Sequence, residues 1–437
     1  MASRLQVGAA AVDITPPLGA HMQGFFQDRQ AEDIADPLYA RAIVLQNESV
    51  AMAIVVCDII GACRSDLDIA RTRVAELTDI PAAHVFLSCT HTHYGPTTLQ
   101  LAHIPKEEAY TEWAMRKAAD AVKLAVNRLR PAKVGVASGL CPEETHNRRF
   151  RMRDGTVKTN PGIGNTEILE AAGPVDPEVG LAVFLDEQDS PIAALGNYSL
   201  HYVSSGAPVA ISANYFGAFS RALQRMAGTE FVAIMANGCC GDINNVNPLA
   251  PSPPMPQPHY QVERVGNVIA ARACAAWNTI HTFDPEPILG VGIREIEFER
   301  RTSSADELAV AKDAYGKQDD IGLLEWVYAS EALKLAGWPT SWSIPIMGLR
   351  IGDLGIAGLP CEAFVEYGLQ IKERSPFVHT MAVELANDFV GYCPTDVALD
   401  EGGYETRLCC WAMAAKGTER KMVEAGIAVL DELAELN

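Results

Sequence analysis

Residues 84–96 read HVFLSCTHTHYGP, an apolar run that passes directly into a polar loop. The run His84–Cys89 is short and bounded by polar residues, which predicts a buried β-strand. His91 and His93 follow it two positions apart, so in an extended chain their imidazoles lie on the same face. Imidazole is the commonest metal ligand in proteins, and two on one face can share a metal ion or a substrate. The alternative is a pair of exposed loop histidines.

Other predicted strands also end in polar residues. They are Ile192–Leu200, which ends at His201; Phe231–Met235, followed by Asn237–Asp242; Leu354–Ala357, followed by Leu359–Glu362; and Thr380–Leu385, followed by Asn387–Tyr392. Because ligands of α/β folds bind beyond the carboxyl ends of the strands, we expect these segments to converge on one site. Each also has an ordinary explanation. His201 can be a core residue and Glu362 can stabilise a helix N-terminus, while Asn237–Asp242 is either an anion-binding nest or a tight turn.

Predicted helices separate these strands along the chain. They span Asp66–Leu77, Tyr110–Leu129, Ser212–Met226, Gln261–Trp277, Ser303–Leu335, Ala363–Arg374 and Gly417–Glu435. Further strands are predicted at Ala40–Leu45, Val50–Asp58, Val134–Ser138, Leu181–Leu185 and Met347–Ile351. Strands interleaved with helices over the whole length indicate an α/β fold. The proline-rich segment Pro251–Pro258 is either a surface lid or a passive insertion.

The composition is that of a packed globular protein, with 437 residues of which 48% are hydrophobic and 21% charged. Lys and Arg number 35 against 55 Asp and Glu, a formal net charge of −20 at pH 7. This excess of acid argues against nucleic acid as a partner and against stable association with a membrane, and it favours a small-molecule substrate. The chain does not open on a basic segment followed by an apolar run, and its 11 cysteines are scattered. We therefore expect reduced thiols in a cytoplasmic protein, as a monomer or a homo-oligomer.

The polar strand ends suggest a specific chemistry. If His91, His201 and Glu362 meet, two imidazoles and a carboxylate form the donor set of a hydrolytic zinc site. His93, beside such a site, would hold a developing oxyanion or shuttle a proton. A rival hypothesis is thiol catalysis by Cys240 or Cys361 with His93 as the base.

Several short motifs extend this interpretation over nearly the whole chain. They are VGAAAVDITP (7–16) with MQGF (22–25), THTHYGP (90–96), NRR (147–149), NYSLH (197–201), GDIN (241–244), PCE (360–362), NDFVGYCPT (387–395) and YE (404–405). In kind and in order they resemble the motifs of the neutral/alkaline, non-lysosomal ceramidase family, zinc-dependent amidases that split the N-acyl bond of ceramides.

The resemblance implies a layered α/β catalytic domain with β-sheets packed between helices, and one Zn²⁺ per chain. The implied metal ligands are His91, His201, Glu362 and Tyr392, although the Tyr392 phenol can equally be a donor to the oxyanion. The implied catalytic residues are His93, Arg148, Tyr392 and Asn244, and the implied substrate-binding residues are Asn147, Gly241 and Asp242.

The chain departs from the family pattern at two points. Asn244 and Asn245 stand where the family has a serine and a proline, which excludes a serine acyl-enzyme and leaves Asn244 as a hydrogen-bond partner. We also expect a single catalytic domain over residues 1–437, without the signal peptide and the C-terminal immunoglobulin-like domain of the family.

The predicted function is therefore a zinc hydrolase that uses metal-activated water to cleave an amide, or a related ester or lactone, in a soluble substrate. Two alternatives remain open. One is a non-catalytic metabolite- or sugar-binding protein of the same fold. The other is a true ceramidase acting on lipid.

Overall fold

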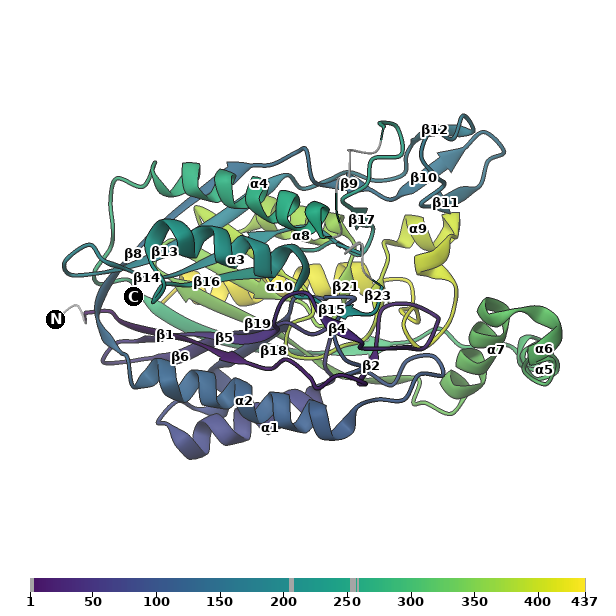
Figure 1. The fold of residues 1–437 in the computed structure, drawn as a ribbon, viewed down its shortest axis with the longest axis horizontal. Coiled ribbons are helices and arrows are strands. Elements are labelled where there is room, and N and C mark those ends of the chain that lie inside the picture. Colours follow the sequence, from purple (N-terminus) through teal and green to yellow (C-terminus); the bar gives the residue numbers. More distant parts are fainter. Residues whose placement is uncertain (1–3, 204–207, 252–256, 258, 437) are drawn as a thin grey trace.

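The computed structural model describes residues 4–203, 208–251, 257 and 259–436, which form a four-layer α/β structure (Figure 1). Two β-sheets pack face to face in the middle, and helices cover the outer face of each sheet. The α/β class and the layered arrangement of sheets between helices are therefore confirmed.

The larger sheet has eight strands in the order β16-β14-β13-β8-β1-β5-β6-β7. Their bounds are β1 Gln6–Asp13, β5 Tyr39–Gln46, β6 Ala51–Cys57, β7 Val85–Cys89, β8 Arg130–Leu140, β13 Glu178–Asp186, β14 Pro191–Tyr198 and β16 Val232–Asn237. Strand β6 pairs in parallel with β7, and β14 pairs in parallel with β16, while the other neighbours are antiparallel. The two parallel pairs form the two edges of the sheet.

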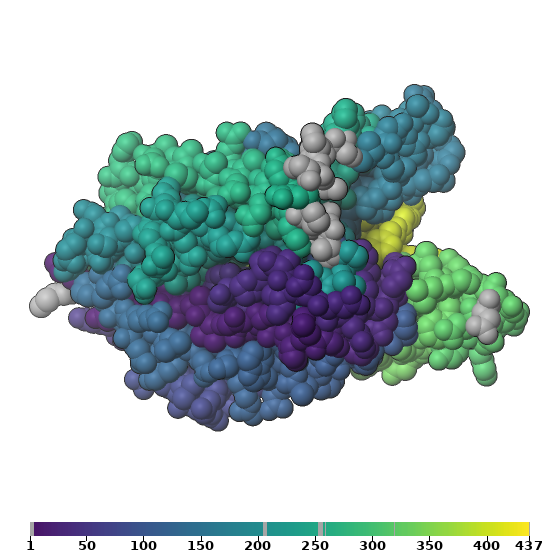
Figure 2. Space-filling view, viewed as in Figure 1, coloured from purple at the N-terminus to yellow at the C-terminus, as the bar shows by residue number. Residues whose placement is uncertain are grey.

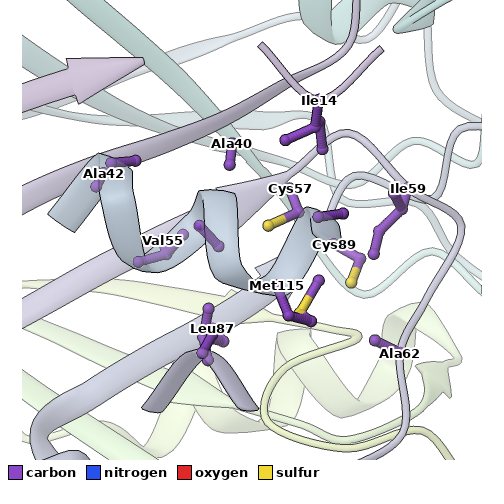
Figure 3. Close-up of a cluster of buried hydrophobic side chains, with 14 of the residues drawn as sticks. Ile14, Ala40, Ala42, Val55, Cys57, Ile59, Ala62, Leu87, Cys89 and Met115 are labelled. Carbon is purple, nitrogen blue, oxygen red and sulfur yellow. The ribbon is translucent and has the colours of Figure 1, made fainter. Parts of the chain in front are cut away.

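Helices α1 to α4 cover one face of this sheet. Helices α1 (Arg64–Leu77) and α2 (Glu108–Val126) form one core with the sheet, with α1 beside β7 and α2 over β1 and β5. Helices α3 (Asn214–Ala227) and α4 (Tyr260–Trp277) form a second core, with α3 on β16 and α4 over β8 and β13. Figure 3 shows the first of these two cores, with residues of the sheet and of α2 in contact. Helix α2 approaches strand β1 closely, because α2 turns alanines toward the sheet and β1 carries a glycine at the contact. A Cβ atom on Gly8 would lie 2.0 Å from the carbonyl oxygen of Ala125.

The smaller sheet, in the order β18-β19-β20-β22, packs on the other face. Its strands are β18 Leu289–Glu299, β19 Ser341–Ile351, β20 Leu354–Gly358 and β22 His379–Val383. Helices α8 (Val365–Arg374) and α10 (Thr418–Ala434) cover its outer face. Side chains alternate between the two faces of these strands, so one set fills the core between the sheets and the other set packs on the helices.

Two groups of short elements project from one end of the molecule (Figures 1 and 2). One is a sheet of β10 (Arg149–Met152), β11 (Val157–Thr159) and β12 (Ile168–Ala171). The other is a helical lobe of α5 (Ala305–Tyr315), α6 (Gln318–Ile321) and α7 (Leu323–Ala336). The stretch Ser303–Leu335, predicted to be helical, is helical but is divided into these three helices. The chain breaks near Gly316 and again at Gly322, whose φ of 75° is left-handed and ends a helix.

Short elements complete the described structure. They are β2 His21–Met22, β3 Arg29–Gln30, β4 Asp33–Ile34, β9 His146–Asn147, β15 Ala210–Ile211, β17 Ile243–Asn244, β21 Glu362–Ala363, β23 Tyr392–Cys393, α9 Asp396–Glu401, η1 Ala82–His84 and η2 Tyr404–Thr406. The predicted lid or insertion Pro251–Pro258 falls largely outside the described residues. Within the described ranges, no helix is both long enough and apolar enough to cross a membrane.

Candidate metal centre

The predicted ligands lie in segments that follow strands of both sheets. His91 comes two residues after β7, and His201 comes three residues after β14. Glu362 and Tyr392 are register partners in the short parallel pair of β21 and β23. The structure brings these four residues together with His93 in one buried site.

Three buried imidazoles form the centre of this site. The ring centroids of His91 and His93 lie 4.8 Å apart, those of His91 and His201 4.7 Å, and those of His93 and His201 5.0 Å. Each ring offers a nitrogen within 4.8 Å of the nitrogens of the other two. By proximity alone, all three rings are candidates for holding one metal ion.

Hydrogen bonds assign the tautomers of these rings. Nδ1 of His91 lies 2.7 Å from the carbonyl oxygen of Ile60, and Nδ1 of His93 lies 2.9 Å from that of Gly24. A carbonyl oxygen only accepts, so both Nδ1 atoms carry hydrogen and both Nε2 atoms carry a lone pair. Nε2 of His93 then accepts a hydrogen bond from Nε2 of His201 at 3.1 Å, which leaves the lone pair of His201 on Nδ1. Only His91 and His201 therefore keep a free lone pair for a metal.

Glu362 places a carboxylate oxygen beside these two lone pairs. Its Oε2 atom lies 3.2 Å from Nε2 of His91 and 4.0 Å from Nδ1 of His201. All three atoms are buried, and apart from these contacts with one another none has a hydrogen-bond partner among the described residues. Unpaired buried polar atoms are costly, and two imidazoles with a carboxylate suit Zn²⁺. These three residues therefore fit the metal that the motifs imply.

Burial and neighbouring charges shift the pKa values of the three rings. It lowers the pKa of His91, but the Glu362 carboxylate raises that pKa by more, and the net shift is upward. Burial and the neighbouring His91 lower the pKa of His93 well below its usual value. Burial and Arg148 do the same for His201. His93 and His201 are therefore neutral at pH 7, the state in which an imidazole binds a metal or accepts a proton.

Tyr392 adds a hydroxyl group to the site. Its ring stacks on that of His201, with centroids 6.4 Å apart and 12° between the planes. Burial and the Glu362 carboxylate raise the pKa of Tyr392 well above its usual value, so the phenol keeps its proton. The guanidinium carbon of Arg148 lies 5.4 Å from the centroid of the Tyr392 ring. Tyr392 is thus a hydrogen-bond donor whose ring rests on Arg148.

Glu405 anchors Arg148, a role that sequence reasoning missed. Nε of Arg148 donates to Oε1 of Glu405 at 2.8 Å, and its Nη2 donates to the carbonyl oxygen of Gly241 at 2.6 Å. Oε2 of Glu405 accepts from Arg149 at 3.1 Å and from the Thr159 hydroxyl at 2.8 Å. Glu405 is completely buried, so one buried carboxylate pairs with two buried guanidinium groups.

A cavity opens onto the candidate metal centre. His91, His93, Glu362 and Tyr392 lie on its wall. Most of the remaining wall is apolar, and it includes Phe25, Phe26, Ile60, Leu101, Tyr404 and Trp411. The side-chain amide of Gln23 also lies on the wall. Its nitrogen donates to the carbonyl oxygen of Leu99 at 3.0 Å, and its oxygen accepts from the N–H of Leu99 at 3.1 Å. The cavity therefore favours an uncharged, apolar group next to the site.

The remaining predicted site residues make hydrogen bonds within the loops that surround Arg148. Nδ2 of Asn147 donates to Asp242 at 2.6 Å, and Asp242 also accepts from the backbone of α8. Nδ2 of Asn244 donates to Asn160 at 2.8 Å. These contacts, with that of the Gly241 carbonyl, connect the loops that hold Arg148. Substrate contact by these residues stays a prediction.

The loop that carries the histidines is held in a strained shape. His91 has a left-handed φ of 65°, which is unfavourable for a residue with a side chain. The next residue, Thr92, donates its hydroxyl to the carbonyl oxygen of Ser212 at 2.6 Å and accepts from Nδ2 of Asn214 at 3.0 Å. The Thr92 hydroxyl therefore ties the loop to the start of α3.

We expect Thr92→Val to lower the free energy of unfolding by about 1–3 kcal/mol, because it leaves buried partners of the hydroxyl unpaired. The measurement is urea unfolding at pH 7. Thr92→Ser, which keeps the hydroxyl, is the control and should lose less. A valine variant as stable as the serine variant would contradict this role of the hydroxyl.

The cysteines of the thiol hypothesis are unsuited to nucleophilic catalysis. Cys240 donates its thiol to the buried carboxyl of Glu384 at 2.9 Å, and burial raises the pKa of Cys240 well above its usual value. Burial likewise raises the pKa of Cys361. A nucleophilic thiol requires a lowered pKa, so neither residue has the environment of a reactive cysteine.

Fold and site together define a four-layer α/β protein with a buried histidine and carboxylate centre that could hold a metal. The fold is that of the neutral ceramidases. Neutral ceramidase from Pseudomonas aeruginosa superimposes with a TM-score of 0.75 over 98% of this chain and 75% of its own, at 19% identity. A ceramidase structure described as complexed with C2 gives 0.76 over 99% and 76%, at 17% identity. No protein-family model and no curated protein matches the chain. The predicted resemblance is therefore confirmed in the fold.

Proposed function

We propose that this chain is a zinc-dependent hydrolase that cleaves an N-acyl amide bond, or a related ester or lactone, with activated water. The observation that carries the proposal is the group of three buried, unpaired donor atoms on His91, His201 and Glu362. The likeness in fold to the ceramidases supports amide chemistry in particular.

Each residue of the site has a role in this reaction. When bound, zinc would polarise the scissile carbonyl and lower the pKa of water toward about 7. We assign the transfer of the proton from the attacking water to the leaving group to His93, which is neutral and whose Nε2 lone pair would exchange its contact with His201 for one with the water. Tyr392, which keeps its proton, donates a hydrogen bond to the oxygen that gains negative charge. Arg148 orients Tyr392, because its own charge is already paired with Glu405.

The substrate we propose is a small, soluble molecule with an uncharged apolar group beside the scissile bond. The apolar wall of the cavity supports an uncharged apolar group beside the scissile bond. The net charge of −20 supports a small, soluble substrate, because it disfavours an anionic membrane or nucleic acid as the source of the substrate.

Two other functions have a specific observation in their favour. A ceramidase acting on lipid is favoured by the names of the structural neighbours. A protein that binds a metabolite without catalysis is favoured by Asn244, since it stands at a position where the family has serine. The buried donor atoms on His91, His201 and Glu362 favour the hydrolase over the metabolite-binding protein without catalysis.

A panel of N-acyl amides, esters, lactones and a short-chain ceramide, assayed with and without a chelator, tests the proposal. We expect hydrolysis of at least one soluble member, loss of at least about a hundredfold on chelation, and recovery on adding zinc. Activity that is indifferent to chelation would contradict metal dependence. Activity on ceramide alone would contradict the soluble substrate.

A further inference from the structure

The helical lobe α5–α7 interrupts what would otherwise be a simple hairpin. Strands β18 and β19 pair along their whole length, ending with Glu299 opposite Ser341. Beyond that pair, the N–H of Arg300 still donates to the carbonyl oxygen of Thr340 at 3.0 Å. The chain therefore leaves the sheet and returns to it at the same place, and the pairing of the two strands does not depend on the lobe.

The lobe packs on the apolar wall of the cavity. Tyr328 of α7 is buried, and the centroid of its ring lies 6.3 Å from that of Phe26 and 5.7 Å from that of Trp411. Phe26 and Trp411 both line the cavity. The guanidinium of Arg407 lies 3.7 Å from the centroid of the Tyr328 ring and pairs with Glu325 of the same helix. The Tyr328 ring is thus fixed directly behind two wall residues.

Helix α7 holds a second part of the same wall. Nζ of Lys334 donates to the carbonyl oxygen of Ala102, and the ring of Trp326 lies 5.5 Å from that of His103. Leu101 and Ala102 line the cavity. Three parts of the wall that are far apart in the sequence, at Phe26, Leu101–Ala102 and Trp411, therefore rest on one helix of the lobe.

We infer that α7 determines the size of the substrate, with Tyr328 as the positioning residue that sets how long an apolar group the cavity accepts. This inference rests on the proposed function and adds to it a specificity for the length of the substrate's apolar group. Tyr328 acts through Phe26 and Trp411, not by touching the substrate. Removing its ring leaves space behind those two side chains, into which they can move, because packed interiors leave few voids of their own.

The test is the ratio of kcat/KM values over a series of N-acyl para-nitroanilides from acetyl to decanoyl. We expect the wild type to reject acyl groups above a certain length. Tyr328→Ala should raise the ratio of long-chain to short-chain kcat/KM by about tenfold or more, in the range that pocket fit contributes. Val310→Ala, an exposed apolar position on α5 of the same lobe, should leave the ratio unchanged. A ratio does not depend on how much of the protein is folded.

The outcomes separate the two proposals. A wild type that, with or without zinc, hydrolyses no member of this series and none of the amides, esters and lactones of the panel overturns the proposed function. A wild type with a length limit that Tyr328→Ala leaves in place overturns the inference alone. If the alanine variant does not fold, Tyr328→Leu provides the same comparison with a smaller apolar side chain. An unchanged limit in that variant also overturns the inference.

Discussion

His201→Ala is expected to lose the metal and the hydrolytic activity together, whereas His93→Ala is expected to keep the metal and lose only the activity. Both rings are buried and 3.1 Å apart at their Nε2 atoms, so distance does not distinguish them. Their hydrogen bonds do. Nδ1 of His93 is used by the carbonyl oxygen of Gly24 and its Nε2 by His201, which leaves His201 with the free lone pair on Nδ1.

The measurement is the zinc affinity of the two variants beside the wild type, with circular dichroism as the check of folding. For His201→Ala we expect an affinity at least about a hundredfold lower, since even outer partners of metal ligands cost 10–100-fold. For His93→Ala we expect the smaller loss, about tenfold, because His93 is itself such an outer partner through its contact with His201. Equal loss of metal in both folded variants would show that His93 is also a ligand.

Glu405→Ala is expected to cost about 3–5 kcal/mol in the free energy of unfolding, because it leaves the buried charges of Arg148 and Arg149 without their carboxylate. The same change releases Arg148 from its place beside the Tyr392 ring. A partly folded population at 37 °C and a lower kcat in the folded fraction should follow.

A matched control is Glu424→Ala, which breaks an exposed glutamate–arginine pair with Arg374 at 2.9 Å. Exposed pairs of this kind contribute little to stability, because water and salt screen them. Urea unfolding of both variants at pH 7 gives the comparison. If Glu405→Ala costs no more than Glu424→Ala, the buried carboxylate does not have the structural role described here.

Much of the fold could be predicted from periodicity, and the exceptions have physical reasons. Strands such as Ala51–Cys57 are apolar throughout because both faces of their sheet are covered, so their sequence is distinctive. Strand Leu289–Glu299 was missed, since several of its side chains are exposed and charged. Periodicity predicted that Ser303–Leu335 is helical but not where it divides, for example at Gly322, where a left-handed φ separates α6 from α7.

The candidate site was predictable in its chemistry but not in its internal contacts. The polar residues after each strand, together with the motifs, pointed to His91, His201 and Glu362 without any knowledge of distance. The role of Glu405 was not accessible in this way, because it pairs with a residue 257 positions away. The separation of His93 from the ligands likewise depends on a hydrogen bond between rings, which no sequence pattern encodes.

The most direct test of the metal centre is elemental analysis of the purified wild type and of the double variant His91→Ala/His201→Ala. Both should be folded, as judged by circular dichroism. We predict one zinc ion per chain in the wild type and none in the double variant. Stoichiometric zinc in the double variant, or none in wild type supplied with zinc, would contradict the metal centre and the hydrolase built on it.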